Sequence, residues 1–473
     1  MEAPPDPRDV APPSATGFLG GPLGRYAAPG ERSWRRLAPV VVASAVLPFV
    51  GAWLRQGHCV QQGWSGDDQF WRQCFSDLPA QYQIAGLSRG LPGWAGADLQ
   101  PEGTPPLVGL LMAAIGGIVP AGDPVTSSRW YLAVWAVVLV ACAMVTVWCV
   151  AAIYPRHLDL ASRLALSPVV ITAGLLTGDG VLVMLVALAM YAWVRGWWIG
   201  AGVLLGLGCL GRPWVVAVVV ALLLWGWRRR RLSGAVATAG VAVATAGLLA
   251  ALVSLVNGNA VGRPLREWWS AQPSYGSLWF LPQGVKPEWA LGAPATQVIL
   301  ILVWVLALGL GVLLVRTAWH TPTWPQTALV VAGTVTVLAP VYPVQGSLWV
   351  LLLAALSGVR WRDLLVWAAV EIGHASLLWL YIAAPSNPEK GLPVQWYALA
   401  VVLRIVTNLW IVTQPLSLAG TPQPGDERRA EGAVDERERL SAHSATMEVP
   451  ASTPALAGAG RGTQHNPPVT EGP

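Results

Sequence analysis

Charged residues are scarce in this chain of 473 residues. Asp, Glu, Lys and Arg together make up 12% of the sequence, hydrophobic residues make up 54%, and the mean hydropathy is +0.51. A soluble globular domain carries roughly 25% charged residues, so the composition excludes an ordinary soluble domain. The net charge of +5 comes mostly from arginine and, in so apolar a chain, indicates membrane topology. No nucleic-acid partner is expected.

The sequence also lacks the local motifs of several common sites. Its five cysteines show no zinc-ligand spacing. No Gly-rich loop is arranged to cradle a phosphate, and no nucleophile elbow is present. We therefore predict no metal site and no cofactor, and the need for a divalent ion stays open. The first 33 residues contain no apolar segment, so no cleavable signal peptide is expected.

Apolar runs are the main feature of the rest of the chain. Most are long enough to cross a hydrocarbon core of ~30 Å, and many of the 27 tryptophans lie at their ends, where indole rings favour the membrane interface. We predict an all-α polytopic membrane protein with about twelve transmembrane helices. They are placed near residues 36–54, 127–153, 161–176, 181–194, 197–210, 213–227, 235–256, 295–315, 326–340, 347–358, 364–383 and 395–414.

The arginines between these runs predict the orientation. The run 106–119 is short and Gly-rich, and we expect it to form an interfacial helix rather than a span. With both tails in the cytoplasm, Arg195 and the run 228–231 then lie inside, as the positive-inside rule requires. If 106–119 spanned the membrane, both would lie outside. Acidic residues gather in two predicted outer loops, 55–105 and 257–294.

Three parts of the chain follow from this pattern. Residues 1–33 and 415–473 are rich in Pro, Gly, Ala and charge and are expected to be disordered cytoplasmic tails, whereas 34–414 form the membrane domain. Several predicted spans are short and joined by polar outer turns. Non-helical backbone at that depth must face protein or water, which indicates a wet cavity suited to catalysis or transport.

The first predicted outer loop carries the densest set of motifs. It contains Cys74-Phe75-Ser76-Asp77-Leu78-Pro79, then Tyr82, then Arg89-Gly90-Leu91. This order resembles the bacterial glycosyltransferase family 87 of the GT-C superfamily, which includes polyprenyl-phosphomannose-dependent mannosyltransferases of actinobacteria. The resemblance extends over roughly 36–414, through Leu166-Ser167-Pro168, Asp179, Arg212-Pro213, Gly276-Ser277-Leu278-Trp279, Tyr342 to Gln345 and Arg360-Trp361-Arg362.

Four positions depart from the family pattern. Thr104-Pro105-Pro106 replaces Glu-Tyr-Pro, with Glu102 just upstream; Thr177-Gly178-Asp179 replaces Asn-Trp-Asp; Arg212 replaces Lys; and Ala339-Pro340 replaces Asn-Lys. By the resemblance, these positions belong to the donor and acceptor sites. A member of this fold without catalytic activity is therefore one alternative.

The resemblance implies sugar transfer from a lipid phosphate, for which a base and a phosphate-holding cation are needed. Asp77 is the candidate base; alternatively it caps a helix that begins at Leu78. Arg212 is the candidate phosphate ligand, or it reaches toward the headgroups. Asp179 either joins the site or complements a helix dipole. Arg89, Glu102, Tyr82 and Gln345 complete the expected substrate-binding set.

The expected reaction transfers a hexose, mannose by resemblance, from a polyprenyl-phosphate carrier to a lipid, glycan or protein acceptor. It would proceed with inversion on the extracytoplasmic side of the plasma membrane. The absence of a nucleotide-sugar site fits a lipid-borne donor. A lipid or solute transporter or flippase is the other alternative, although no internal repeat of the kind common in transporters is visible.

Two side-chain pairs are also predicted. Cys59 and Cys74 share an oxidising outer loop and are expected to form a disulfide bond. Glu371 and Arg404 lie at similar depth in consecutive apolar runs, and burying them as an ion pair avoids two isolated charges. His374, one turn after Glu371, is a candidate third member. On this basis, Glu371→Gln should lower the folded yield, and the exchange Glu371→Arg with Arg404→Glu should partly restore it.

Overall fold

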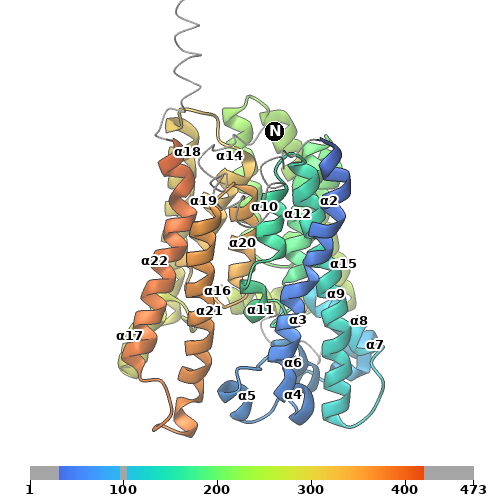
Figure 1. Cartoon of the computed structure of the whole chain (residues 1–473), viewed down its shortest axis with the longest axis vertical. Coiled ribbons are helices and arrows are strands. Elements are labelled where there is room, and N and C mark those ends of the chain that lie inside the picture. The colour runs from blue at the N-terminus through green and yellow to red at the C-terminus, as the bar shows by residue number, and fades with distance from the viewer. Residues whose placement is uncertain (1–30, 96–103, 420–473) are drawn as a thin grey trace, which may run out of the picture. The chain divides into compact units, whose positions relative to one another are not determined.

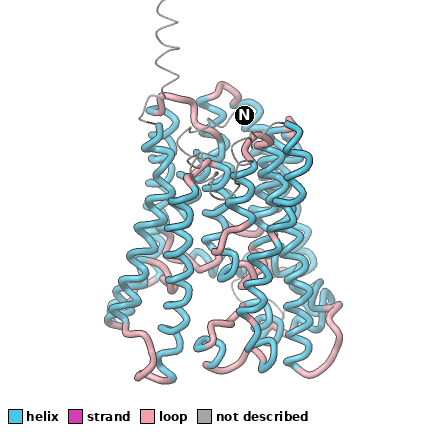
Figure 2. Tube along the Cα trace, in the orientation of Figure 1, coloured by secondary structure: helices cyan, strands magenta, loops and turns pink. Residues whose placement is uncertain are grey.

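The computed structural model of the chain describes residues 31–95 and 104–419. All regular elements in these ranges are helices, and most run roughly along the length of one bundle (Figure 1). Figure 2 shows loop segments within the length of the bundle as well as at its ends.

The helices are α2 Glu31–Ser44, α3 Val46–Arg55, α4 Gly57–Gln62, α5 Asp68–Trp71, α6 Asp77–Ile84, α7 Gly90–Ala95, α8 Pro106–Gly116, α9 Pro124–Ile153, α10 Leu158–Ala165, α11 Val169–Ala173, α12 Gly180–Val194, α13 Trp198–Cys209, α14 Trp214–Arg228, α15 Leu232–Val256, α16 Gly262–Trp269, α17 Leu281–Val285, α18 Ala293–Thr317, α19 Trp324–Leu338, α20 Gly346–Leu356, α21 Trp361–Ala383 and α22 Val394–Ala419. Short 3-10 helices are η1 Leu87–Arg89, η2 Leu278–Phe280, η3 Pro287–Trp289 and η4 Ala384–Ser386.

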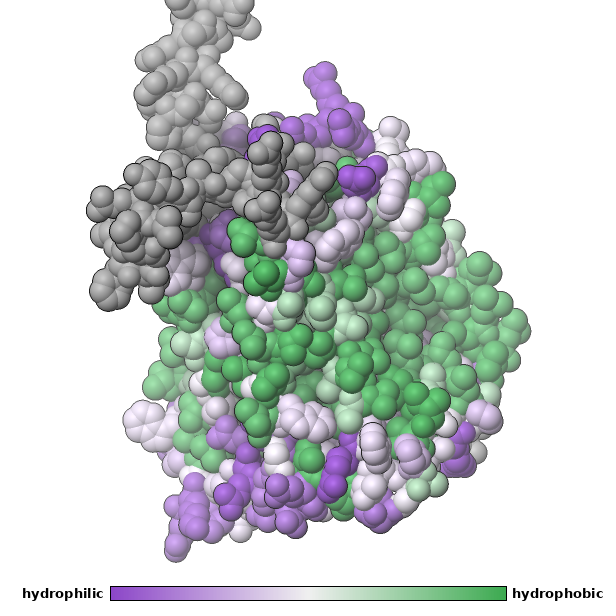
Figure 3. Space-filling view, turned by 45° about the vertical axis from the view of Figure 1, so that its right-hand side comes forward, coloured by the Kyte–Doolittle hydropathy of each residue, from purple (hydrophilic) through white to green (hydrophobic). Residues whose placement is uncertain are grey.

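In the described part of the chain, six helical segments are long and apolar enough to cross a membrane: Leu37–Arg55, Pro124–Ile153, Leu232–Val256, Ala293–Thr317, Trp361–Ser386 and Val394–Ser417. Six shorter apolar helices accompany them, namely α8, α12, α13, α14, α19 and α20. Apolar side chains cover the middle of the visible surface, and polar side chains gather toward its ends (Figure 3). The chain thus has the composition and helical architecture expected of a polytopic membrane protein, and every predicted apolar run contains helix.

The centre of the bundle is formed by short helices. Every residue of α20 is buried, and so is almost all of α19. In α15, by contrast, few residues are buried, and the helix packs closely on α13. Gly202 permits this contact, because a Cβ there would lie 2.7 Å from the carbonyl oxygen of Thr238. Such close approach through small residues is common where transmembrane helices pack.

Helix α8 occupies the run that we expected to form an interfacial helix. The run 106–119 does form a helix, over Pro106–Gly116, but seven of its eleven residues are buried. Gly116 lies against the backbone of Leu87, where a Cβ would collide with the carbonyl oxygen. Helix α8 therefore packs on η1 and α7, and little of its surface is left to face lipid.

The predicted tails lie mostly outside the described residues. At their inner edges the helices reach further than predicted, because α2 already begins at Glu31 and α22 continues through Pro415 to Ala419. Packing accounts for the second extension, since Leu416 contacts a small apolar cluster formed by Leu314, Ala318 and Val330.

Candidate functional site

Asp77 is placed by contacts with a segment a hundred residues away. Its backbone N–H donates to the carbonyl oxygen of Leu176 at 3.0 Å, and the hydroxyl of Ser76 donates to that of Leu175 at 2.7 Å. Both carbonyls precede α12. The alternative role of Asp77 was to cap a helix that begins at Leu78. Helix α6 instead begins at Asp77 itself, and its N-cap residue is Ser76. The start of α6 is therefore docked onto the connection between α11 and α12.

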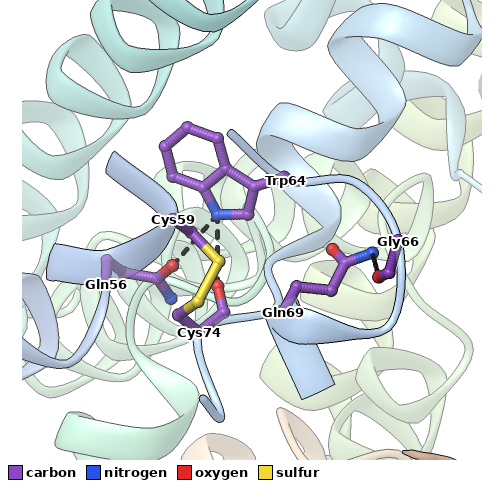
Figure 4. The surroundings of a disulfide bond; sticks show 6 residues. All are labelled: Gln56, Cys59, Trp64, Gly66, Gln69 and Cys74. Atoms are coloured by element: carbon purple, nitrogen blue, oxygen red, sulfur yellow. Dashed lines mark hydrogen bonds between the residues drawn. A yellow bond between two sulfur atoms is a disulfide. The ribbon is translucent and has the colours of Figure 1, made fainter. Parts of the chain in front are cut away.

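A disulfide bond holds the segment that leads to Asp77. Cys59 in α4 is bonded to Cys74, and their Cα atoms lie 5.8 Å apart (Figure 4). The indole N–H of Trp64 lies beside this bond and donates to the side-chain oxygen of Gln56 and to the carbonyl oxygen of Cys74, both at 3.1 Å. Both cysteines are fully buried. The predicted disulfide is present, and it ties the segment before α6 to α4.

Asp179 and Arg212 form an ion pair between two helix starts. Asp179 directly precedes α12, and Arg212 stands two residues before α14. Oδ1 of Asp179 accepts hydrogen bonds from Nε and Nη2 of Arg212 at 3.2 and 3.1 Å. Next to Arg212, Gly211 packs against Leu182, whose side chain would have to move to admit a Cβ at this position. Asp179 is fully buried, while 23% of the Arg212 side chain is exposed.

The charges of this pair act on Asp77. Burial raises the pKa of the Asp77 carboxyl to about 6, the positive charge of Arg212 opposes the rise, and the negative charge of Asp179 adds to it. We call Asp77, Asp179 and Arg212 the charged cluster. A carboxyl group with a pKa close to neutrality can take up a proton from a substrate hydroxyl. The guanidinium group of Arg212 can bind an anion.

One oxygen of the cluster has no partner. Oδ2 of Asp179 is buried and accepts no hydrogen bond from any described residue. Leaving such an acceptor unpaired costs about 1–3 kcal/mol or more for a charged group. The cluster therefore has unused capacity to accept a hydrogen bond, as expected of a site that takes a polar ligand.

Gln345 lies at the start of a third short helix beside the cluster. It is the N-cap residue of α20 and is buried. One turn further along α20, the ring centroid of Trp349 lies 5.9 Å from Cζ of Arg212, and Trp349 stacks on Trp214 with centroids 5.0 Å apart. Three helix starts, those of α12, α14 and α20, thus meet near Arg212.

The remaining predicted site residues lie elsewhere. Tyr82 is buried and stacks on Tyr131 at 4.6 Å, so it fixes α6 on α9. Arg89 is exposed at the end of η1, and no contact joins it to the charged cluster in the described part of the chain. Glu102 lies outside the described residues. The structure therefore brings together Asp77, Asp179 and Arg212, with Gln345 on the neighbouring helix, and assigns Tyr82 a packing role.

Two features of the site were missed in the sequence. The ring of Trp349 lies near Arg212 and stacks on Trp214, yet among 27 tryptophans nothing in the sequence singles these two out. Gly178 is explained by packing, because a Cβ there would lie 3.0 Å from both Trp135 and Val108. The space that a larger side chain would need before Asp179 is thus already occupied.

A small apolar cavity adjoins the cluster. It has a volume of about 50 Å³ and lies among α3, α9, α10, α11, α12 and α20. Its lining includes Gly180, the residue after Asp179, and Leu348, the residue before Trp349. The cavity thus reaches the residues next to Asp179 and Trp349 in the chain, and its own lining carries no charged side chain.

The site combines a buried carboxyl group with a raised pKa, a partly exposed cation and a neighbouring apolar space. Over residues 31–95 and 104–419, no set of three His, Cys, Asp or Glu side chains is arranged to hold a metal ion. Comparison of the chain with protein-family models and with curated proteins finds no match.

Proposed function

We propose that this protein is a membrane glycosyltransferase that moves a hexose from a polyprenyl-phosphate carrier to a hydroxyl group of an envelope lipid, glycan or protein. The observation that carries the proposal is the meeting of Asp77, Asp179 and Arg212 from three separate segments. Mannose as the sugar and inversion at its anomeric carbon come from the family resemblance.

The chemistry needs two protein groups. The acceptor oxygen attacks the anomeric carbon while the bond from that carbon to the phosphate oxygen breaks. Asp77 takes the proton of the acceptor hydroxyl, and the bonding electrons leave with the lipid phosphate. Arg212, partly exposed in the same cluster, would hold the phosphate and the charge that develops on it.

The surroundings of the cluster support a lipid-borne donor. The apolar cavity that begins at Gly180 and Leu348 offers hydrocarbon contacts next to the cation. A lipid phosphate has the same two-part character, with an anionic head and an apolar tail. We therefore assign the phosphate to Arg212 and the first part of the lipid chain to the region of this cavity.

The membrane placement is part of the proposal. Twelve crossings, formed by α2 with α3, α9, α10 with α11, and the single helices α12, α13, α14, α15, α18, α19, α20, α21 and α22, would put both tails in the cytoplasm. Asp77 would then lie on the extracytoplasmic side of the plasma membrane, within the acidic segment 55–105. A lipid-linked sugar is presented on that side once it has been flipped.

Replacing Asp77 by Asn tests the proposal. Asn keeps the size of the side chain and removes the basic oxygen, so transfer should fall by at least ~100-fold, the usual contribution of a positioned base. The assay is hexose transfer from synthetic polyprenyl-phosphomannose by the full chain in nanodiscs. Asp68→Asn, which changes an exposed acid of the same segment, is the matched control and should transfer at the wild-type rate.

Two results would contradict the proposal. Wild-type transfer by a folded Asp77→Asn protein would place the base elsewhere. Movement of the intact lipid-linked sugar across a reconstituted vesicle membrane, without any transfer, would favour the transporter alternative. Melting temperatures of both variants should stay near that of the wild type, because Asn keeps the size of Asp and neither residue is the N-cap of its helix.

A further inference from the structure

Arg212 is anchored to Asp179 at a single oxygen atom. Nε and Nη2 both donate to Oδ1, at 3.2 and 3.1 Å. In a two-oxygen pair, parallel hydrogen bonds fix the plane of the guanidinium group. When both donors bind one oxygen, the hydrogen bonds fix the distance between the guanidinium group and that oxygen. The guanidinium plane can still tilt about the oxygen. Binding of a phosphate by the edge of the group requires a defined plane.

Trp349 lies where it can fix this plane. Cζ of Arg212 is 5.9 Å from the centroid of its ring, within the range of a cation–π contact. The Trp349 ring also stacks on Trp214, with an angle of 20° between the planes. Trp349 is 7% exposed and Trp214 is 2% exposed. The guanidinium group of Arg212 thus faces an aromatic ring that a second buried ring holds in place.

Trp349 is itself held independently of the charged cluster. Arg404 donates to the carbonyl oxygens of Tyr342 at 2.9 Å and Pro343 at 3.0 Å, just before α20 begins. Arg404 is fully buried and paired with Glu371. The start of α20 is therefore tied to α21 and α22. The ring of Trp349 can orient Arg212 without depending on Asp179.

We propose that Trp349, supported by Trp214, is a positioning residue that holds the Arg212 guanidinium plane so that its Nη1 edge meets a lipid phosphate. Within the described parts of the chain, Nη1 makes no hydrogen bond, so this edge is available. The inference rests on the proposed role of Arg212 in binding the phosphate. Beyond that role, the inference names Trp349 as the residue that sets the orientation in which Arg212 binds the phosphate.

Binding of farnesyl phosphate, a short lipid phosphate, to the purified full chain in detergent tests the inference. Calorimetry should show that Trp349→Leu raises the Kd at least ~5-fold and that Trp349→Phe, which keeps an aromatic face, raises it less than about 2-fold. Trp225→Leu is the matched control. Trp225 is also buried, its indole N–H has no hydrogen-bond partner among the described residues, and it lies in α14, but it packs on Trp193. The Kd of this variant should stay within about 2-fold of the wild-type value.

A double-mutant cycle separates positioning from general stability. In an Arg212→Gln background, Trp349→Leu should add no further loss of binding, because the group it orients is gone. Equal losses with and without Arg212 would overturn the inference. If Trp349→Leu does not fold, Trp349→Met takes its place in the same cycle.

The two proposals fail in different ways. If the wild type binds no farnesyl phosphate, the phosphate role of Arg212 falls and this inference falls with it. If the wild type binds it and Trp349→Leu binds it equally well, only the role of Trp349 is wrong.

Discussion

Asp77 has two charged neighbours of opposite sign. Asp179 raises its pKa and Arg212 lowers it, and burial adds the largest rise, which brings the value to about 6. The position of Asp77 as the first residue of α6 is set by hydrogen bonds from Ser76 and Asp77 to the segment before α12. The hydrogen bonds that place the Asp77 carboxyl group therefore also bring it near Asp179 and Arg212, the charges that shift its pKa.

The pH dependence of transfer should reveal this tuning. A base must be ionised to act, so kcat/KM should rise with pH through about 6 and level off above it. Asp179→Asn removes a negative neighbour and should move the midpoint to lower pH. Arg212→Gln removes a positive neighbour and should move it to higher pH. Both variants lose activity, so the midpoint of the residual rate profile is the measurement.

The direction in which each variant moves the pH midpoint is the first control. Shifts of both midpoints in the same direction would mean that these side chains act on another titrating group. The exposed Asp68→Asn variant should leave the midpoint unchanged, because Asp68 is not among the groups that shift the pKa of Asp77.

At the scale of elements, the non-helical break between α19 and α20 depends on hydrogen bonds from other segments. Its carbonyl groups lie where helical hydrogen bonds end, and such groups must be paired inside a membrane protein. Ser274 N–H, the Ser277 hydroxyl and the Trp279 indole N–H donate to the carbonyl oxygens of 340, 339 and 338, respectively. Arg404 donates to those of 342 and 343. The segment 274–279 and Arg404 thus cap the break together.

The buried ion pair is the centre of this support. Nε of Arg404 donates to both carboxylate oxygens of Glu371 at 3.1 Å, as the sequence predicted. Asn408, not foreseen, donates to Glu371 at 2.5 Å and accepts from Tyr342 and Trp367, both at 2.9 Å. His374 is buried beside the pair, and neither of its ring nitrogens has a hydrogen-bond partner among the described residues.

Exchanging the charges of Glu371 and Arg404 should therefore not restore the folded yield, contrary to the expectation from the sequence. The carboxylate introduced by Arg404→Glu would face the carbonyl oxygens that Arg404 now satisfies. The Glu371→Arg, Arg404→Glu protein should thus give less folded material than either single variant. Glu371→Gln leaves a buried cation without a counter-charge and should lower the free energy of unfolding by about 3–5 kcal/mol. Folded yield by size exclusion and thermal unfolding in detergent are the measurements.

A surface pair supplies the control for that experiment. Glu267 pairs with Arg263 in α16, where both side chains are about a third exposed or more. Glu267→Gln should change stability by less than about 1 kcal/mol. Recovery of the wild-type yield by the exchanged Glu371 and Arg404 pair would show that only the charges matter and not the carbonyl contacts.

At the scale of the whole molecule, short helices form the interior and long helices supply much of the surface. Helices α19 and α20 are almost wholly buried, whereas α15 exposes most of its length. Short buried helices leave room for their polar starts inside the bundle. The charged cluster lies at such starts, which explains how charged side chains come to lie in so apolar a protein.

The proposed twelve crossings can be tested by labelling. Lys286→Cys and Arg229→Cys introduce exposed thiols in segments expected on opposite sides of the membrane. A membrane-impermeant maleimide should label Lys286→Cys in intact cells and Arg229→Cys only after the membrane is opened. The unmodified chain, whose free cysteines 142, 149 and 209 are largely buried, is the control. Labelling of both positions from outside would contradict the topology.

The sequence by itself determined the helical class, the location of the apolar helices, the disulfide between Cys59 and Cys74 and the pairing of Glu371 with Arg404. Each follows from a local property, such as the length of an apolar run or the cost of an isolated charge. The same reasoning named Asp77, Asp179 and Arg212 only as separate candidates, with a resemblance to guide it.

Only the tertiary structure decided that these three residues meet. Their proximity depends on how α6 docks on the segment before α12 and on how closely Gly211 approaches Leu182. It also decided that Tyr82 packs on α9 and that the ring centroid of Trp349 lies 5.9 Å from Cζ of Arg212. The physical reason is that hydropathy depends on the residues of one segment, whereas a site depends on distances between segments, which are set by the packing of the whole bundle.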